Sequence, residues 1–199
     1  MACGTHGIVI LNRGHGNKGS HSQFDPGATF GELREVDLVA GYFDAIEQHL
    51  STGGIAVHRL DTGSYANRHN RAGQIARTTR GRVLHILGHV NSAGRPGRYG
   101  AVFHDHRSSN GAIAARLIAD QMRPIRELTT IKLVSTTRTG NWRRAYNVLS
   151  PVYSAPANCS GVLLEPGFIN SPTHQPLWTG EGLMRLGNAI ARGILPYFS

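Results

Sequence analysis

Residues 7–16, Gly-Ile-Val-Ile-Leu-Asn-Arg-Gly-His-Gly, join a short apolar run to a glycine-rich turn. The run Ile8-Val9-Ile10-Leu11 predicts a buried strand, because an uninterrupted apolar segment of this length is typical of a strand that is covered on both faces. The turn carries His15 between two glycines at the carboxyl end of that strand. Outward from this stretch, short apolar runs and longer amphipathic segments alternate along the chain.

These alternating segments predict the fold class. Further strands are expected at 55–57, 83–87, 101–103, 131–134 and 162–164, and helices at 32–50, 65–80, 109–122 and 181–195. Residues 136–160 have no clear period, and Pro151 and Pro156 argue against long helices there. Strands that alternate with helices predict a single α/β domain whose mostly parallel twisted sheet carries helices on both faces.

Composition narrows the class of protein further. The 199 residues are 40% hydrophobic and 17% charged, which excludes a disordered chain. No apolar run approaches the roughly 20 residues of a membrane span, so stable membrane insertion is not expected. The formal net charge is +9, and nearly all the positive residues are arginines. This charge has two interpretations of equal weight: the protein binds an acidic partner, or the arginines only keep it in solution. The sequence has no nucleic-acid-binding motif and 7% aromatic residues, so nucleic acid is not the expected partner.

Three chemically reactive side chains lie at the ends of predicted strands, and a fourth lies near the start of the first predicted helix. His15 follows the first strand, His89 follows the strand at 83–87, Glu165 ends the strand at 162–164, and Glu35 lies near the start of the first helix. The carboxyl ends of parallel strands meet at one edge of a sheet, where functional groups gather. Two histidines and one glutamate form a zinc-ligand set that leaves a position for water, and a second carboxylate can act as general base. The sequence therefore predicts a metal-dependent hydrolytic site.

Ordered sequence blocks surround these residues from residue 7 to residue 197. They are Gly14-His15-Gly16, Asp25-Pro26-Gly27-Ala28 followed by Leu33-Arg34-Glu35-Val36-Asp37-Leu38, Leu87-Gly88-His89-Val90-Asn91-Ser92, Leu164-Glu165-Pro166-Gly167-Phe168-Ile169-Asn170 and Ala191-Arg192-Gly193-Ile194-Leu195-Pro196-Tyr197. In this order and spacing they resemble the zinc-dependent N-acetylmuramoyl-L-alanine amidases of the Amidase_3 type. That family includes bacterial autolysins and the catalytic domains of phage endolysins.

The resemblance implies a role for each of the four residues. His15, Glu35 and His89 would bind one zinc ion per chain, and Glu165 would be the catalytic carboxylate. Glu32 competes with Glu35 as ligand, but the family spacing favours Glu35. The sequence departs from the family at Asn12-Arg13, where Asp-Pro is usual, and in a long loop whose His21 is either an extra ligand or a surface residue.

The implied reaction is hydrolysis of the amide between N-acetylmuramic acid and the L-alanine of the peptidoglycan stem peptide. The alternative is a zinc peptidase that cleaves within the stem peptide. We expect one catalytic domain at 1–199, without a separate wall-binding domain, that acts as a monomer. The N-terminus does not resemble a signal peptide. This favours an endolysin that is made in the host cytoplasm and acts on the wall after release, although a trimmed autolysin domain remains open.

Several further polar residues are candidates for supporting roles. Asn91, Arg143 and Arg144 are candidate substrate contacts, because stem peptides carry free carboxylates. Asn91 and Asp25 could also orient the ligand histidines, while Asp25 could instead cap its Asp-Pro-Gly turn. His104 and His106 follow a predicted strand, and the sequence leaves open whether they line the cleft.

Overall fold

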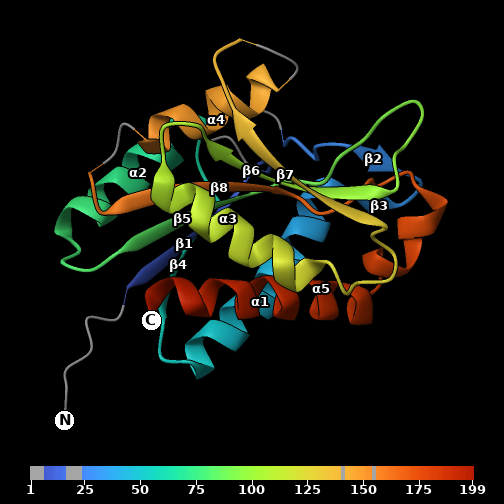
Figure 1. Cartoon of the computed structure of the whole chain (residues 1–199). Helices are drawn as coiled ribbons and strands as arrows, with labels where there is room; N and C mark the ends of the chain where they lie inside the picture. The colour runs from blue at the N-terminus through green and yellow to red at the C-terminus, as the bar shows by residue number, and fades with distance from the viewer. Residues whose placement is uncertain (1–6, 17–23, 140–141, 154–155) are drawn as a thin grey trace.

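The first apolar run forms β1 (Ile8–Arg13), an inner strand of a six-stranded sheet (Figure 1). The order across the sheet is β4-β1-β5-β8-β6-β7. The computed structural model describes residues 7–16, 24–139, 142–153 and 156–199. The other strands of the sheet are β4 (Ala56–Leu60), β5 (Val83–Gly88), β6 (Tyr99–Asp105), β7 (Thr130–Thr136) and β8 (Cys159–Glu165), so every strand predicted from sequence is present.

Strand direction decides which loops meet at each edge of the sheet. β4, β1, β5 and β8 are all parallel, so their carboxyl ends share one edge. β6 runs antiparallel to β8, with Ala101 opposite Glu165 and His104 opposite Val162. β7 is parallel to β6. The sheet is thus mostly parallel, as predicted, but the carboxyl ends of β6 and β7 point to the opposite edge.

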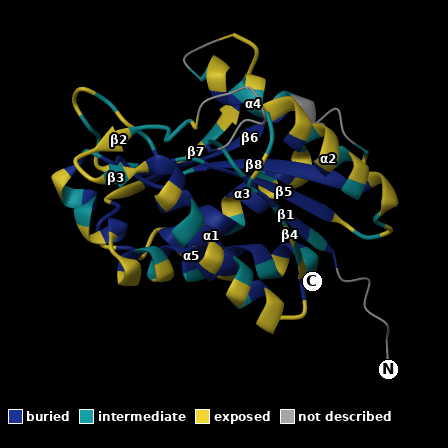
Figure 2. Ribbon diagram, turned by 180° about the vertical axis from the view of Figure 1, so that it is seen from behind, coloured by how far each residue is buried: buried dark blue, intermediate teal, exposed yellow. Residues whose placement is uncertain are grey.

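Helices cover both faces of the sheet, as Figure 1 shows. One face carries α1 (Glu35–Thr52), α3 (Ser109–Met122) and α5 (Gly180–Ile194), and the other carries α2 (Tyr65–Thr78) and α4 (Arg143–Tyr153). Along β1, Val9 and Leu11 join the core beneath α1 and α5, whereas Ile10 joins the core on the other face. The inner strands are therefore buried on both sides (Figure 2), which explains their uninterrupted apolar sequences.

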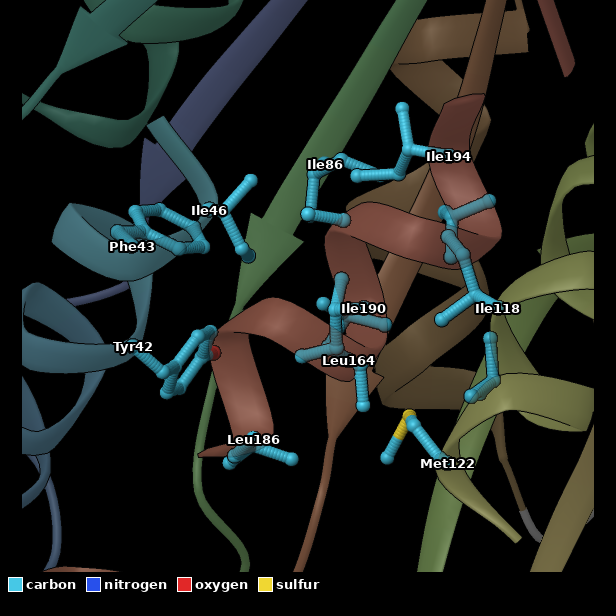
Figure 3. Close-up of a cluster of buried hydrophobic side chains, with 14 of the residues drawn as sticks. Tyr42, Phe43, Ile46, Ile86, Ile118, Met122, Leu164, Leu186, Ile190 and Ile194 are labelled. Carbon is cyan, nitrogen blue, oxygen red and sulfur yellow. The ribbon is translucent and has the colours of Figure 1, made fainter. Parts of the chain in front are cut away.

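The larger of the two cores lies between the sheet and the α1, α3 and α5 layer. Its side chains come from facing positions on the three helices and on β5 and β8 (Figure 3). In α1, Tyr42, Phe43 and Ile46 are completely buried, in agreement with the helical spacing of that segment. Among the described residues no helix has the length and apolar character needed to span a membrane.

Two sequence predictions about local structure are wrong. The first helix begins at Glu35 rather than at residue 32, because β3 (Leu33–Arg34) pairs with β2 (Thr29–Phe30) and Glu32 is exposed in the turn between them. Residues 136–160, expected to be irregular, contain the 11-residue helix α4.

Helix α4 forms because its apolar residues have helical spacing. Val148 and Leu149 lie three and four positions after Ala145, and all three pack on the sheet. Pro151 lies in the last turn of the helix, where it removes one backbone hydrogen bond without interrupting the turns that pack. The remaining helical segments are two 3-10 helices, η1 (Pro172–Trp178) and η2 (Leu195–Phe198).

Candidate metal centre and active site

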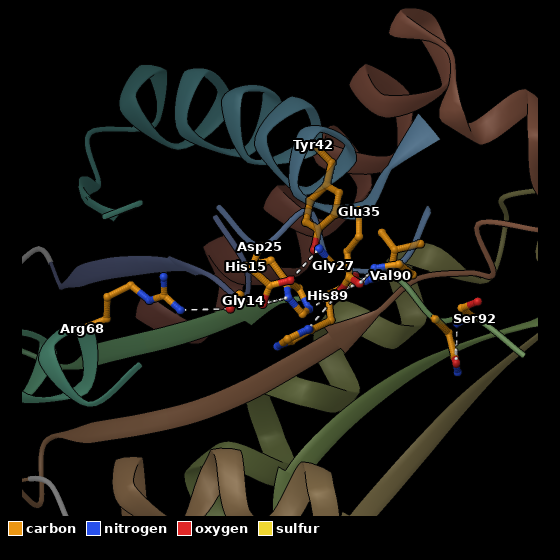
Figure 4. Close-up of polar contacts among 12 residues, drawn as sticks. Gly14, His15, Asp25, Gly27, Glu35, Tyr42, Arg68, His89, Val90 and Ser92 are labelled. Carbon is orange, nitrogen blue, oxygen red and sulfur yellow. Dashed lines mark hydrogen bonds and ion pairs between the residues drawn. The ribbon is translucent and has the colours of Figure 1, made fainter. Parts of the chain in front are cut away.

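Three of the predicted site residues converge at the edge where the parallel strands end (Figure 4). His15 follows β1, His89 follows β5, and Glu35 is the first residue of α1. Oε1 of Glu35 lies 3.3 Å from Nε2 of His15 and 3.0 Å from Nδ1 of His89. One ligand atom from each residue lies within 4.8 Å of the other two. In the part of the chain that the structure describes, this is the one such convergence of three His, Cys, Asp or Glu residues.

The carboxylate of Glu35 is fixed by the backbone around it. The backbone N–H of Val90 donates to Oε1 at 3.0 Å, and that of Ala28 donates to Oε2 at 2.9 Å. Glu35 is only 4% exposed. Burial opposes ionisation, but the hydrogen bonds and charges of His15 and His89 outweigh it and hold the pKa of Glu35 well below its ordinary value. The carboxylate is therefore ionised and oriented before any ligand arrives.

His15 is oriented from its other ring nitrogen. Its Nδ1 lies 3.0 Å from Oδ2 of Asp25, and because an ionised carboxylate only accepts, Nδ1 is the donor. Nε2, on the opposite side of the ring, faces Glu35 and is the nitrogen that a metal ion would take. Asp25 also accepts the N–H of Gly27 through Oδ1 at 3.0 Å, so it performs both of the roles considered from sequence. Carboxylate–histidine pairs of this kind orient metal ligands in many proteins.

Two glycines let the backbone pack directly against the cluster. A Cβ atom at Gly14 would overlap the imidazole ring of His89. A Cβ at Gly27 would lie 2.6 Å from Oε2 of Glu35 and 2.8 Å from Cδ2 of His15. Gly27 also has φ +70°, a conformation that favours glycine. The cluster thus sits in a cradle that any larger residue at these positions would disturb.

Glu165 ends β8 beside the same cluster. The N–H of His89 donates to the carbonyl of Leu164 at 2.9 Å, which places the segment after β5 alongside the end of β8. Burial raises the pKa of Glu165 and the charge of Glu35 adds to the rise, while His89 opposes it. Its carboxylate forms no hydrogen bond with any residue that the structure describes. A carboxyl group whose pKa is raised by burial, and which has no hydrogen-bond partner among the described residues, is suited to exchange a proton with a reacting group.

The donor set fits a catalytic zinc ion. Two imidazole nitrogens and one carboxylate oxygen are a known three-ligand set for hydrolytic zinc, in which the fourth position accepts water or substrate. The three donors come from different segments, and two of the three residues are also held through a second polar atom: His15 through Nδ1 on Asp25, and Glu35 through Oε2 on the N–H of Ala28. The residues present therefore fit the zinc ion that the sequence resemblance implies.

The remaining predicted substrate contacts form no hydrogen bond or ion pair with this cluster among the described residues. The backbone of Asn91 joins the segment after β5 to the one after β8: its N–H donates to the carbonyl of Gly167, and its carbonyl accepts from the N–H of Ile169. Its side-chain oxygen accepts from the N–H of Ser92. Arg143 and Arg144 are exposed at the start of α4. The substrate roles of these three residues stay predictions.

His104 and His106 do not line the candidate cleft. Because β6 is antiparallel to β8, its carboxyl end lies at the opposite edge of the sheet from Glu165. His106 contacts the carbonyl of Thr136 on the neighbouring strand at 2.9 Å. His21 lies outside the described residues.

One residue near the cluster was missed from the sequence. Arg68 on α2 is 2% exposed, and its Nη2 donates to the carbonyl of Gly14 at 2.9 Å. Arg68 shares the buried face of α2 with Ala72 and Ala76, at positions i, i+4 and i+8. The alignment of an arginine with two alanines on one helix face was the signal available in the sequence.

Solved structures provide the comparison with known proteins. The chain aligns with the N-acetylmuramoyl-L-alanine amidase AmiC2 of Nostoc punctiforme over 98% of its own length and 97% of that chain, with 20% identity and a TM-score of 0.72. The amidase Ami1 of Mycobacterium smegmatis aligns over 96% of both chains, with 17% identity and a TM-score of 0.71. This chain has the N-acetylmuramoyl-L-alanine amidase fold. The catalytic domain of an endolysin that targets Clostridia difficile also has this amidase fold, with 18% identity, a TM-score of 0.66 and coverage of 95% of this chain and 97% of that one.

Comparisons by sequence alone find no match. No protein-family model matches the chain, and no curated protein matches it. The amidase fold is therefore established from the arrangement of the elements, while the few residues of the candidate metal centre carry the chemical argument.

Proposed function

We propose that the chain is a zinc-dependent N-acetylmuramoyl-L-alanine amidase that cleaves the amide between N-acetylmuramic acid and L-alanine in peptidoglycan. The observation that carries the proposal is the convergence of His15, Glu35 and His89 within 4.8 Å at one sheet edge, beside Glu165. The amidase fold, shared with proteins named for this activity, supports the choice of substrate.

In this proposal Nε2 of His15, Nδ1 of His89 and the carboxylate of Glu35 hold one zinc ion per chain. When bound, zinc supplies Lewis acidity that polarises the scissile carbonyl and acidifies a water molecule. The backbone N–H groups of Ala28 and Val90 hold the Glu35 carboxylate in place, and Asp25 directs the lone pair of His15 toward the centre. The protein thus prepares the donors before the ion binds.

Glu165 moves the protons of the reaction. Its carboxylate accepts a proton from the attacking water and then delivers it to the nitrogen of the departing L-alanine, so one residue serves as base and then as acid. Burial raises the pKa of Glu165, which makes it a stronger base toward the water than an exposed carboxylate would be.

The proposed biological role is that of a phage endolysin. The similarity to an endolysin catalytic domain supports this role, and the net charge of +9 suits the anionic polymers of a bacterial wall. In this role a monomer made in the host cytoplasm reaches peptidoglycan after release. Production inside a susceptible host should leave the cells intact until the membrane is permeabilised, and lysis should follow. Intact cells after permeabilisation, despite activity on purified walls, would contradict the role.

The chemical proposal is tested by digestion of purified peptidoglycan and mass spectrometry of the new ends, with a chelated sample as control. New amino ends on L-alanine that disappear on chelation are the expected result. New amino ends inside the stem peptide would instead assign a zinc peptidase on the same fold. Release that persists under chelation would contradict the metal centre, and a digest without new ends would contradict the enzyme.

A further inference from the structure

Arg68 is a buried charge that the proposed chemistry does not use. Its side chain projects from α2 into the protein and is among the largest that are fully buried, at 2% exposure. Arginine is rarely buried without partners, because its charge is costly to remove from water. The contacts that retain it there therefore indicate what it does.

The guanidinium group of Arg68 joins two loops at the carboxyl edge of the sheet. Nη2 donates to the carbonyl of Gly14 after β1 at 2.9 Å, and Nη1 donates to the carbonyl of Gly63 after β4 at 3.2 Å (Figure 4 shows the first). Burial and the nearby Arg13 lower the pKa of Arg68, whereas the charges of Asp61 and Asp25 raise it. Arginine nevertheless stays protonated in proteins, so Arg68 presents its donors at all physiological pH values.

The carbonyl that Arg68 holds belongs to the peptide group that leads into His15. The N–H of Gly14, in the preceding peptide group, donates at 3.0 Å to the carbonyl of Gly88, the residue before His89. Gly14 also packs so closely on the His89 ring that a Cβ would overlap it. A shift of the Gly14 backbone would therefore move His15 and the surface on which His89 packs together.

We propose that Arg68 is a positioning residue that holds both histidines in metal-binding geometry through the carbonyl of Gly14. This inference rests on the proposed function only in that His15 and His89 bind zinc. Groups that orient metal ligands typically change metal affinity by about 10–100-fold when they are removed. Arg68 touches neither ring, so its loss should weaken zinc binding without removing a ligand.

Arg68→Met removes every donor but keeps much of the stem, and Arg68→Lys keeps the charge with a single donor group. The matched control is Glu127→Gln, which alters another buried charged residue, 4% exposed, whose Oε1 pairs with Arg185 at 2.6 Å outside the metal centre. For each variant, chelator competition gives the zinc dissociation constant, at a temperature where circular dichroism shows the protein folded.

The expected result is a zinc dissociation constant raised about 10–100-fold in Arg68→Met, raised less in Arg68→Lys, and unchanged in Glu127→Gln. A folded Arg68→Met protein with wild-type affinity would overturn the inference. So would an equal loss of affinity in Glu127→Gln, because the effect would then follow from general destabilisation. If Arg68→Met does not fold, Arg68→Lys decides, and wild-type affinity there overturns the inference. Failure of the unmodified chain to bind zinc would contradict the proposed function itself.

Discussion

Gly14 lies directly against the imidazole ring of His89, with no room between them for a side chain. The two residues are 75 positions apart in the sequence but adjacent at the sheet edge, where the N–H of Gly14 also donates to the carbonyl of Gly88 at 3.0 Å. The backbone that carries one candidate ligand, His15, thus forms the wall against which the other, His89, rests. Backbone packing, as well as side-chain contacts, shapes the candidate metal centre.

Gly14→Ala should therefore weaken zinc binding. The added methyl group must displace either the His89 ring or the backbone before His15, and both changes move a ligand. We expect zinc affinity to fall about 10–100-fold, as measured by chelator competition. Gly94→Ala is the matched control, because a Cβ at Gly94 meets no heavy atom within 4 Å. Equal zinc affinity in the two variants would contradict the packing argument.

Glu165→Gln should separate chemistry from metal binding. The amide cannot accept a proton, so hydrolysis should fall by about 10²–10⁴-fold or more, while the zinc content stays at the wild-type level. Release of stem peptides from peptidoglycan gives the rate, and elemental analysis gives the zinc content. Loss of zinc in this variant would move Glu165 into the ligand set, and retained activity would remove it from the mechanism.

Acid should destabilise the fold through two histidines beneath the active-site edge. His85 on β5 is 1% exposed, and its Nε2 accepts from Nδ2 of Asn12 at 3.1 Å. Burial lowers the pKa of His85 to about 3, and burial with the charge of Arg68 lowers that of His69 to about 4. Unfolded histidines titrate near pH 6.5. The stability that these neutral rings contribute is therefore complete above pH 6.5 and is lost as the pH falls toward 3–4.

Urea unfolding of chelator-treated protein between pH 7 and pH 5 tests this dependence. His85 alone should lower the free energy of unfolding by about 1 kcal/mol per pH unit below pH 6.5. His85→Gln should reduce this slope, whatever its stability at pH 7. The control His58→Gln alters a histidine that is exposed on β4 and should keep the wild-type slope. If the pH dependence of the free energy of unfolding is unchanged in His85→Gln, acid destabilises the fold through other groups.

Activity on whole walls should decrease as the salt concentration rises. If the net charge of +9 holds the protein on anionic wall polymers, ions that screen charges beyond about 8–10 Å should reduce binding. Co-sedimentation with purified walls, at salt concentrations from about 50 mM to about 500 mM, measures this binding directly. Binding that does not depend on salt would indicate that the arginines serve solubility.

The sequence predicted the parallel half of the sheet and the candidate metal centre for one physical reason. Strands that are buried on both faces need continuous apolar runs, so β1, β5 and β8 are conspicuous, and the reactive residues follow these runs directly. Once the strands are taken as parallel, His15, His89 and Glu165 must share an edge. The choice of Glu35 over Glu32 followed from the family resemblance, since both glutamates lie near the start of the first predicted helix.

What the sequence did not predict depends on tertiary contacts. The direction of β6 is not encoded in its own apolar run, and this direction moves His104 and His106 to the far edge. Helix α4 forms because Ala145 and Leu149 find a sheet face to cover, which outweighs the unfavourable Pro151. The burial of Arg68 depends on two backbone carbonyls that are brought together only when β1 and β4 pair.

The account's central claim is that His15, Glu35 and His89 together hold a zinc ion. Elemental analysis of the purified chain and of His15→Ala, Glu35→Ala and His89→Ala, each dialysed against the same zinc buffer, tests it most directly. One zinc ion per wild-type chain is predicted, with the metal lost from each of the three variants while circular dichroism shows the fold retained. A wild-type chain without zinc, or a variant that retains the full amount, would contradict the claim.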